Sequence, residues 1–196
     1  MTFYQFAHAL VGGFFSLLGW KRQGLENLPA EGCVIVVANH VSMWDPLVVG
    51  SALPRQVWFM AKEELFHVPA VGWAIRHLGA FPVKRGQGDT SAIRTSLSLL
   101  KEGKVLGLFP EGTRSRSGEM QKGLPGMVLL MEKSGATVVP VKVYGTRQLP
   151  FRAWGKFGLA VGMPLTPEML KAPPEVENRR EWVARRIMQA IEDIQV

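Results

Sequence analysis

Cysteine is almost absent from this chain: Cys33 is the only one among 196 residues. A single cysteine excludes any disulfide framework within the chain, and its place in the apolar run 33–37 predicts a buried, unreactive thiol. The four histidines are scattered without the spacing of metal ligands, so no metal site is predicted. Repeats and low-complexity tracts are also missing, which indicates a single domain without linkers.

Several familiar binding motifs are absent as well. The segment 86–91 lacks a dinucleotide fingerprint, because Ser91 stands where the third glycine is needed. The segment 118–123 has the glycine spacing of a P-loop, but Leu124 takes the place of the required lysine. No Gly-x-Ser-x-Gly nucleophile elbow and no RNA-recognition signature occurs. We therefore expect neither a nucleotide cofactor nor a nucleic-acid partner.

The composition that is present fits one globular domain with a positive charge. The chain is 47% hydrophobic and 20% charged, which is enough to bury one substantial core. It has 23 lysines and arginines against 16 acidic residues, a formal net charge of +7. A surplus of this size favours anionic partners: a phosphorylated substrate, nucleic acid or an acidic membrane face.

Residues 1–20 contain no Asp, Glu, Lys or Arg, and Lys21 and Arg22 follow at once. This stretch approaches the length of about 20 apolar residues that a membrane-spanning helix needs. Polar or small residues nevertheless recur on one side at helical spacing, and large apolar residues recur away from them. The first set is Thr2, Gln5, His8, Gly12, Ser16 and Gly19, and the second is Phe3, Phe6, Leu10, Phe14 and Leu17. Such an amphipathic helix suits the membrane interface better than a crossing.

We therefore expect residues 1–22 to form a membrane-interface helix, peripheral or monotopic, on the cytoplasmic face of the cell membrane. Lys21 and Arg22 would then face anionic headgroups. The alternative is a helix that covers the core of its own domain. A cleaved signal peptide is not expected, because no basic segment precedes the apolar stretch. Residues 23–196 would form the main domain.

Short apolar runs alternate with amphipathic segments along that main domain. Strands are predicted at 33–38, 56–61, 80–83, 104–109, 137–144 and 157–161, and helices at 46–53, 69–78, 90–102, 125–134 and 175–194. Because the strands are apolar with little in–out alternation, the sheet should be covered on both faces. The pattern predicts a single layered α/β domain with a largely parallel sheet flanked by helices.

His40 directly follows the strand predicted at 33–38, so its ring should emerge where open α/β sheets bind their ligands. Asp45 comes five residues later. A carboxylate beside an imidazole fixes its tautomer and stabilises the imidazolium, so this pair predicts a general base. Asp45 also precedes Pro46, and the alternative interpretation is that it caps the helix that begins there. The two interpretations are compatible.

Basic side chains follow several predicted strands directly; they are Lys62, Lys84, Arg85, Arg114 and Arg116. In a parallel sheet these strand ends lie at one edge, so the cations should converge beside His40. Guanidinium groups bind phosphate through paired, charge-assisted hydrogen bonds. The sequence therefore predicts a phosphate site at this edge. The alternative for Arg114 is a solvated turn in which it pairs locally with Glu111.

Four segments in order resemble the blocks of the glycerolipid acyltransferases. They are Asn39-His40-x4-Asp45, then 79–85 (Gly-Ala-Phe-Pro-Val-Lys-Arg), 109–115 (Phe-Pro-Glu-Gly-Thr-Arg-Ser) and 139–141 (Val-Pro-Val). All four occur in order and together span roughly residues 35–145. The resemblance is closest to bacterial-type lysophosphatidic acid (1-acylglycerol-3-phosphate) acyltransferases, whose third block is typically Phe-Pro-Glu-Gly-Thr-Arg.

The resemblance implies transfer of a fatty acyl group from acyl-CoA or acyl carrier protein to the free hydroxyl of lysophosphatidic acid, giving phosphatidic acid. It implies no acyl-enzyme and no cofactor besides the thioester co-substrate. His40 would be the general base and Asp45 would orient it. The implied substrate-binding residues are Lys62, Arg85, Glu111, Gly112, Thr113, Arg114 and Pro140.

In this scheme each block has a task. Arg85 and Arg114 would bind the glycerol phosphate, with help from Lys62. Glu111 and Gly112 would shape the acceptor site, and the proline of the last block would position a loop. The N-terminal helix and the hydrophobic surface near it would form the acyl groove.

Three alternatives stay open at this point. The same chemistry could serve another acceptor, such as glycerol 3-phosphate, a lysophospholipid or a lyso-aminolipid. The chain could be a non-catalytic module whose basic surface docks on anionic lipid. A nucleic-acid binder would show steeply salt-dependent DNA binding. The expected partners are an anionic membrane surface, a lysophospholipid acceptor and the acyl thioester.

Overall fold

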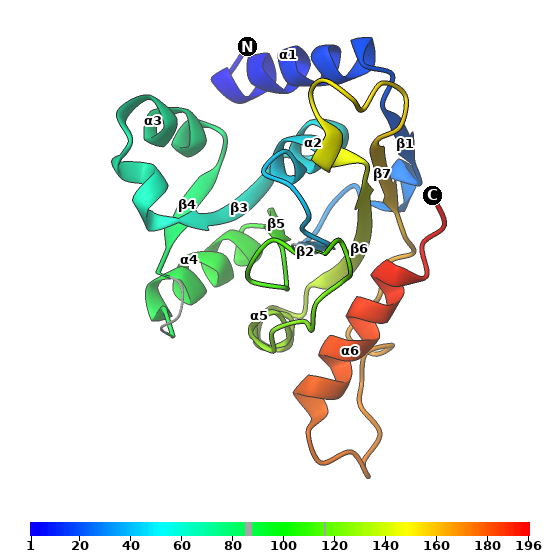
Figure 1. The fold of residues 1–196 in the computed structure, drawn as a ribbon. Coiled ribbons are helices and arrows are strands. Elements are labelled where there is room, and N and C mark those ends of the chain that lie inside the picture. Colours follow the sequence, from blue (N-terminus) through cyan, green and yellow to red (C-terminus); the bar gives the residue numbers. More distant parts are fainter. Residues whose placement is uncertain (85–87, 116) are drawn as a thin grey trace.

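A computed structural model of the chain describes residues 1–84, 88–115 and 117–196 (Figure 1). Within these residues, seven strands form one sheet in the order β1-β7-β6-β2-β5-β3-β4. The strands are β1 (Lys21–Gln23), β2 (Val34–Ala38), β3 (Val57–Lys62), β4 (Ala80–Val83), β5 (Val105–Leu108), β6 (Thr137–Tyr144) and β7 (Gly158–Val161). Neighbouring strands run parallel except β6 and β7, which are antiparallel.

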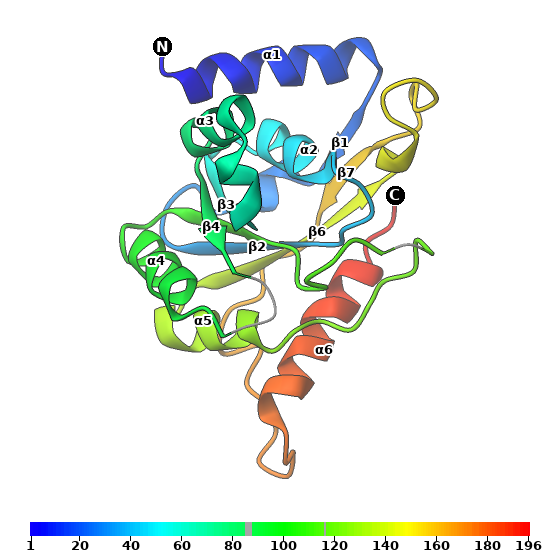
Figure 2. The same cartoon turned by 60° about the vertical axis from the view of Figure 1, so that its left-hand side comes forward.

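Helices cover the sheet on both faces. They are α1 (Phe3–Leu17), α2 (Asp45–Ala52), α3 (Pro69–His77), α4 (Thr90–Lys101), α5 (Gly126–Ser134) and α6 (Arg179–Glu192), with short 3-10 segments η1 (Leu25–Asn27), η2 (Glu63–His67) and η3 (Thr146–Gln148). Figure 2 shows α1, α2 and α3 on one side of the sheet and α4, α5 and α6 on the other. The predicted α/β fold with a largely parallel sheet is confirmed.

The central strand β2 shows why these runs lack polar alternation. Val34 and Val36 pack into a core beneath α1 and α2, whereas Ile35 and Val37 point into a second core beneath α4, α5 and α6. A strand that is buried on both faces needs apolar residues at every position. Residue 40 therefore leaves the sheet at the carboxyl end of its most buried strand.

The sequence did not predict β1, and the reason lies in its composition. Its three residues Lys21–Gln23 are exposed and polar, and the strand forms only because its backbone pairs in parallel with β7. Backbone hydrogen bonding of this kind leaves no mark in a hydrophobic pattern. The domain boundary drawn at residue 22 falls inside this strand. Helix α6 begins at Arg179 rather than at 175, because the Asn178 side chain accepts a hydrogen bond from the Glu181 amide and caps it there.

Helix α1 lies on the domain with a mostly apolar side, from which Val11, Phe15 and Leu18 pack against the core. Of the predicted polar and small residues, only His8 and Gly12 are half-buried, whereas Thr2, Gln5, Ser16 and Gly19 are exposed. The ring of His8 lies 3.3 Å from the carbonyl oxygen of Leu53, and Gly12 faces the backbone of Ser51 closely enough that an added Cβ would lie 3.7 Å from its oxygen. Phe15 is the one fully buried residue of the helix.

The opposite side of α1 is also apolar, and it faces outward. Phe6, Leu10, Phe14 and Leu17 are all exposed, Leu17 by 75%. The neighbouring helix α3 adds exposed Trp73, whose ring contacts that of Phe3 at 4.8 Å between centroids. We call these five exposed residues the apolar face. Val11, Phe15 and Leu18 pack against the core, as the alternative of a covering helix predicts, and the apolar face is left exposed on the other side.

Among the residues that the structure describes, no helix has both the length and the apolar character needed to span a bilayer.

Candidate active site

The first predicted block forms a buried histidine–aspartate pair at the carboxyl end of β2. Nδ1 of His40 lies 2.8 Å from Oδ2 of Asp45. Asp45 is fully buried and His40 is nearly so. A carboxylate can only accept, so Nδ1 carries the proton, and Nε2 is left as the nitrogen that can take up another one.

Asp45 does not cap α2, so that alternative interpretation is wrong. Its Oδ2 instead accepts hydrogen bonds from the backbone amides of Val41 and Ser42, each at 2.7 Å, and α2 begins at Asp45 itself without a side-chain cap. The carboxylate thus closes the turn that carries the histidine. Three donors on one oxygen fix both the position of Asp45 and the orientation of the His40 ring.

The other carboxylate oxygen has a partner that the sequence did not indicate. The hydroxyl of Thr146, at the start of η3, donates to Oδ1 of Asp45 at 2.5 Å, and Thr146 is fully buried. The two residues are 101 positions apart. They meet because β6, which precedes η3, is the direct neighbour of β2 in the sheet.

We expect Thr146→Val to lower the free energy of unfolding by about 1–3 kcal/mol, because an isosteric side chain without a hydroxyl leaves a buried carboxylate oxygen unpaired. Turnover should fall by less than about ten-fold, since three donors still hold the other oxygen. Denaturant unfolding and a steady-state assay measure the two effects. Thr146→Ser, which keeps the hydroxyl, is the matched control. A Thr146→Val protein as stable as the serine variant would contradict this account.

The third block is tied to the first through Glu111, which follows β5. Its Oε1 accepts a hydrogen bond from the backbone amide of His40 at 2.8 Å, and its Oε2 accepts one from the amide of Gln121 at 3.1 Å. Glu111 is buried. Both oxygens are therefore hydrogen-bonded within the protein, and Oε1 helps to position the backbone of His40. The predicted contact of Glu111 with the substrate stays a prediction.

The turn after Glu111 needs glycine. Gly112 has φ +69°, and an added Cβ would lie 2.8 Å from Cδ1 of Leu124. Thr113 and Arg114, which follow, are exposed. The chain then returns to the pair, because the amide of Ser115 donates to the carbonyl oxygen of His40 at 2.8 Å.

Arg147 is a second residue that sequence reasoning missed. Its guanidinium donates to the carbonyl oxygens of Val41, at 3.3 Å, and of Ser115. It therefore joins the first and third blocks from the end of β6. Because its guanidinium is hydrogen-bonded to backbone carbonyl oxygens, Arg147 holds the two loops together and is not a free cation.

An aromatic wall flanks the histidine. The rings of His40 and Phe109 stack with centroids 4.2 Å apart, and Phe109 stacks on Phe59 at 5.7 Å. Phe59 and Phe109 pack against the core beneath α1 and α2. The exposed edge of the imidazole is thus bordered by apolar surface on the side that leads toward α1.

The predicted cations differ in how free they are. Nζ of Lys62 lies 2.9 Å from Glu64, and Nζ of Lys84 lies 3.9 Å from Glu63. Within the described ranges, Arg114 forms no ion pair with a carboxylate. Arg114 therefore differs from Lys62 and Lys84 in being exposed without a carboxylate partner among the described residues.

Arg85 and Arg116 lie outside the described residues, and their predicted roles stay predictions. The Asp89 carboxylate accepts a hydrogen bond from the Lys84 amide at 2.8 Å and also caps α4. These hydrogen bonds, with that from Lys84 the largest, lower the pKa of the Asp89 carboxyl. The second block, residues 79–85, contains β4, whose carboxyl end lies at the same edge of the sheet as that of β2.

Pro140 lies in the strand predicted at 137–144, and its predicted role in positioning the loop of the last block stays a prediction. It is buried within β6, in register with Val37 of β2. A proline inside a sheet needs a place where its missing N–H is not required. On the outer side of β6 the pairing with β7 begins only at Val141, and before it there is a single bridge between Val138 and Leu165. Pro140 lies in this gap in the pairing of β6, where no N–H donor is needed.

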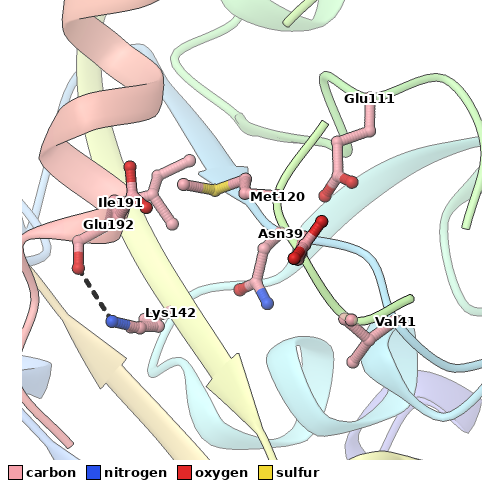
Figure 3. Close-up of a pocket in the computed structure, with 9 residues that line it drawn as sticks. Asn39, Val41, Glu111, Met120, Lys142, Ile191 and Glu192 are labelled. Carbon is pink, nitrogen blue, oxygen red and sulfur yellow. Dashed lines mark hydrogen bonds between the residues drawn. The ribbon is translucent and has the colours of Figure 1, made fainter. Parts of the chain in front are cut away.

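A cavity of about 210 Å³ lies between the third block and the end of α6 (Figure 3), and Asn39 and Val41, on either side of His40 in the sequence, help to line it. Its lining includes the carboxylates of Glu111, Glu119 and Glu192. The one lysine there, Lys142, donates through Nζ to the carbonyl oxygens of Glu192 and Ile194. Among the described residues, three carboxylates and one lysine line this cavity, so it does not resemble the cationic phosphate site that the sequence predicts.

The comparisons with known proteins agree with this geometry. A family model described as Acyltransferase matches residues 20–144. A 1-acyl-sn-glycerol-3-phosphate acyltransferase of Bacillus subtilis is 34% identical over 175 residues, which are 83% of this chain and 86% of that protein. One from Borreliella burgdorferi is 28% identical over 183 residues, covering 88% and 72%.

The fold has a solved counterpart as well. The crystal structure of the 1-acyl-sn-glycerophosphate acyltransferase PlsC from Thermotoga maritima matches with a TM-score of 0.71 and 31% sequence identity, covering 96% of this chain and 80% of that one. Fold and site together define an α/β enzyme. The chain belongs to the acyltransferase family, and its predicted resemblance to lysophosphatidic acid acyltransferases is confirmed.

Proposed function

We propose that this enzyme transfers a fatty acyl group from acyl-CoA or acyl carrier protein to the free hydroxyl of 1-acylglycerol-3-phosphate, giving phosphatidic acid. The observation that carries the proposal is the buried pair of His40 and Asp45, with 2.8 Å between Nδ1 and Oδ2. The named activity of relatives such as the Bacillus subtilis enzyme supports the choice of acceptor.

In the proposed reaction Nε2 of His40 removes the proton of the acceptor hydroxyl as the oxygen attacks the thioester carbonyl carbon. The tetrahedral intermediate carries negative charge on the former carbonyl oxygen. Its collapse breaks the carbon–sulfur bond, and the imidazolium returns the proton to the leaving thiolate. Asp45 stabilises the imidazolium between the two transfers. The reaction needs no acyl-enzyme and no redox or metal cofactor.

The acceptor phosphate is proposed to bind at Arg114. This side chain is exposed, and it immediately precedes Ser115, whose amide is bonded to the carbonyl oxygen of His40. A phosphate held there would leave the glycerol hydroxyl beside the imidazole. Lys62 and Arg85 would add positive charge from the ends of β3 and β4, with Lys62 weakened by its pairing with Glu64.

We expect Arg114→Ala to raise the KM for 1-acylglycerol-3-phosphate about ten-fold, because one charge-assisted contact is worth about one such factor. The kcat should change less. Steady-state kinetics with the acceptor varied measures both. Arg179→Ala removes an exposed arginine on α6 and is the matched control. An acceptor without phosphate should not distinguish Arg114→Ala from wild type; an equal loss with that acceptor would show that Arg114 does not bind the phosphate.

The proposed acceptor is an amphiphile, and we propose that the enzyme takes it from the cytoplasmic surface of a membrane on which the apolar face lies. Four of the five residues of that face come from α1, and Trp73 comes from α3. Lys21 and Arg22 are exposed at the end of α1, where they would meet anionic headgroups. The aromatic wall of Phe59 and Phe109 would then border the path of the acyl chains.

The direct test is to incubate the purified protein with an acyl thioester and 1-acylglycerol-3-phosphate and to follow thiol release and phosphatidic acid together. The proposal expects the two to form in equal amounts. Thiol release with glycerol 3-phosphate, a lysophospholipid or a lyso-aminolipid as the better acceptor would replace the substrate. A protein that binds vesicles but releases no thiol with any of these acceptors would be a non-catalytic docking module.

A further inference from the structure

The loop 149–156, between η3 and β7, exposes two large aromatic side chains. Phe151 is 94% exposed and Trp154 is 71% exposed. Large aromatic side chains dominate the energy of the surfaces that bury them, so two of them so fully in solvent mark a contact surface. This loop lies outside the four sequence blocks, and the resemblance assigns it no role.

The loop is firmly attached, so the exposure of its rings does not come from a loose chain. Leu149 and Ala153 are buried in the core beneath α1 and α2, as is Phe157 directly after the loop. The Arg152 amide donates to the carbonyl oxygen of Gln148 at 2.9 Å. The buried residues alternate with Phe151 and Trp154, which fixes these two rings on the outer side.

The loop is also joined to the end of α1. The amide of Gly155 donates to the carbonyl oxygen of Leu18 at 2.9 Å, and Gly19 and Gly155 approach each other closely. In both views the loop lies beside the C-terminal end of α1 (Figures 1 and 2). The loop that carries Phe151 and Trp154 is therefore attached to the end of α1 that carries Leu17, a residue of the apolar face.

The charged residues of this loop and of the segment that follows α1 are all basic. Lys21, Arg22, Arg152 and Lys156 are all exposed here. No Asp or Glu occurs in residues 1–25 or 133–167. Exposed aromatic side chains in segments whose charged residues are all basic complement an anionic phospholipid surface. At such a surface tryptophan lies at the level of the headgroups, and basic residues contact phosphate.

We propose that loop 149–156 is a second membrane contact, which inserts Phe151 and Trp154 into an anionic phospholipid surface beside α1. The inference rests on the proposed docking of the apolar face and adds a separate element to it. Two contacts hold a peripheral protein far better than one, because the second binds at a high effective concentration. They also fix the tilt of the domain, and with it the height of His40 above the lipid.

The test is co-sedimentation with vesicles of phosphatidylcholine containing phosphatidylglycerol. Phe151→Ser/Trp154→Ser should raise the vesicle dissociation constant about ten-fold or more. Leu10→Ser/Leu17→Ser, on the apolar face, should weaken binding as well. Met169→Ser is the matched control; this exposed methionine lies between β7 and α6, a segment that packs on the α6 side of the sheet. Arg152→Gln/Lys156→Gln should weaken binding to these vesicles but not to pure phosphatidylcholine.

Each outcome has a distinct meaning. If the loop variant binds like wild type while the α1 variant is weakened, the inference is overturned and α1 docks alone. If wild type does not bind vesicles, both the loop contact and the proposed membrane docking fail. Concentration-dependent dimerisation that the loop variant abolishes, with vesicle binding intact, would make the loop a self-association surface instead. Turnover on a short-chain, monomeric acceptor tests the proposed reaction separately from all of these.

Discussion

Replacing His40 by alanine is expected to lower acyl transfer by about 10³-fold or more, because a positioned base contributes factors of this order and no other described group stands in its place. The imidazole makes two kinds of contact: Nδ1 with Asp45 and a stacked contact with Phe109. The backbone amide and carbonyl of residue 40 hold Glu111 and Ser115, and these bonds survive the substitution. The fold should therefore be kept.

Thiol release and phosphatidic acid formation measure this loss, and thermal unfolding checks that the variant is folded. His67→Ala is the matched control, since it removes an exposed histidine from η2. If the His40→Ala enzyme kept more than about a tenth of the wild-type rate, residue 40 would not be the general base.

The second large effect is expected from Asp45→Asn, which removes a charge and little else. The amides of Val41 and Ser42 both need an acceptor, so the asparagine carbonyl must take the place of Oδ2. Its amide then faces the hydroxyl of Thr146, which can accept as well as donate. The His40 tautomer is kept, and only the negative charge that stabilises the imidazolium is lost. We expect kcat to fall about 10²–10³-fold.

Asp45→Ala is the comparison that separates charge from structure. It leaves the four donors on the carboxylate without an acceptor, and the free energy of unfolding should drop by about 3 kcal/mol or more. Denaturant unfolding of both variants alongside kcat distinguishes the two effects. An Asp45→Asn enzyme that is folded and turns over at the wild-type rate would contradict the proposed role of the charge.

The parts of the site that could be predicted are those set by local sequence. The apolar run of β2 ends at Ala38, which places residue 40 at the edge of the sheet, and Asp45 lies five residues further on. The resemblance of the four blocks supplied the roles. The hydrogen-bond partners of the Asp45 carboxylate could not be predicted from the sequence. Whether it caps α2 or closes the preceding turn depends on three-dimensional contacts.

The missed residues depend on long-range pairing. Thr146 and Arg147 reach the site only because β6 lies beside β2, and a threonine followed by an arginine carries no signal of its own. That β6 accepts Pro140 likewise depends on where β7 begins to pair with it. For α1, the pattern predicted one apolar side, but the structure has two: Val11, Phe15 and Leu18 pack against the core, and Phe6, Leu10, Phe14 and Leu17 are exposed.

The central claim is that the acceptor hydroxyl attacks the thioester directly after His40 takes its proton. The most direct measurement is intact-protein mass spectrometry combined with thiol release, with the acyl thioester supplied alone and then together with 1-acylglycerol-3-phosphate. The account predicts an unchanged protein mass in both cases, and thiol release only when the acceptor is present. A protein that gains one acyl group from the thioester alone would contradict it, because the acyl group would then have passed through a covalent enzyme intermediate.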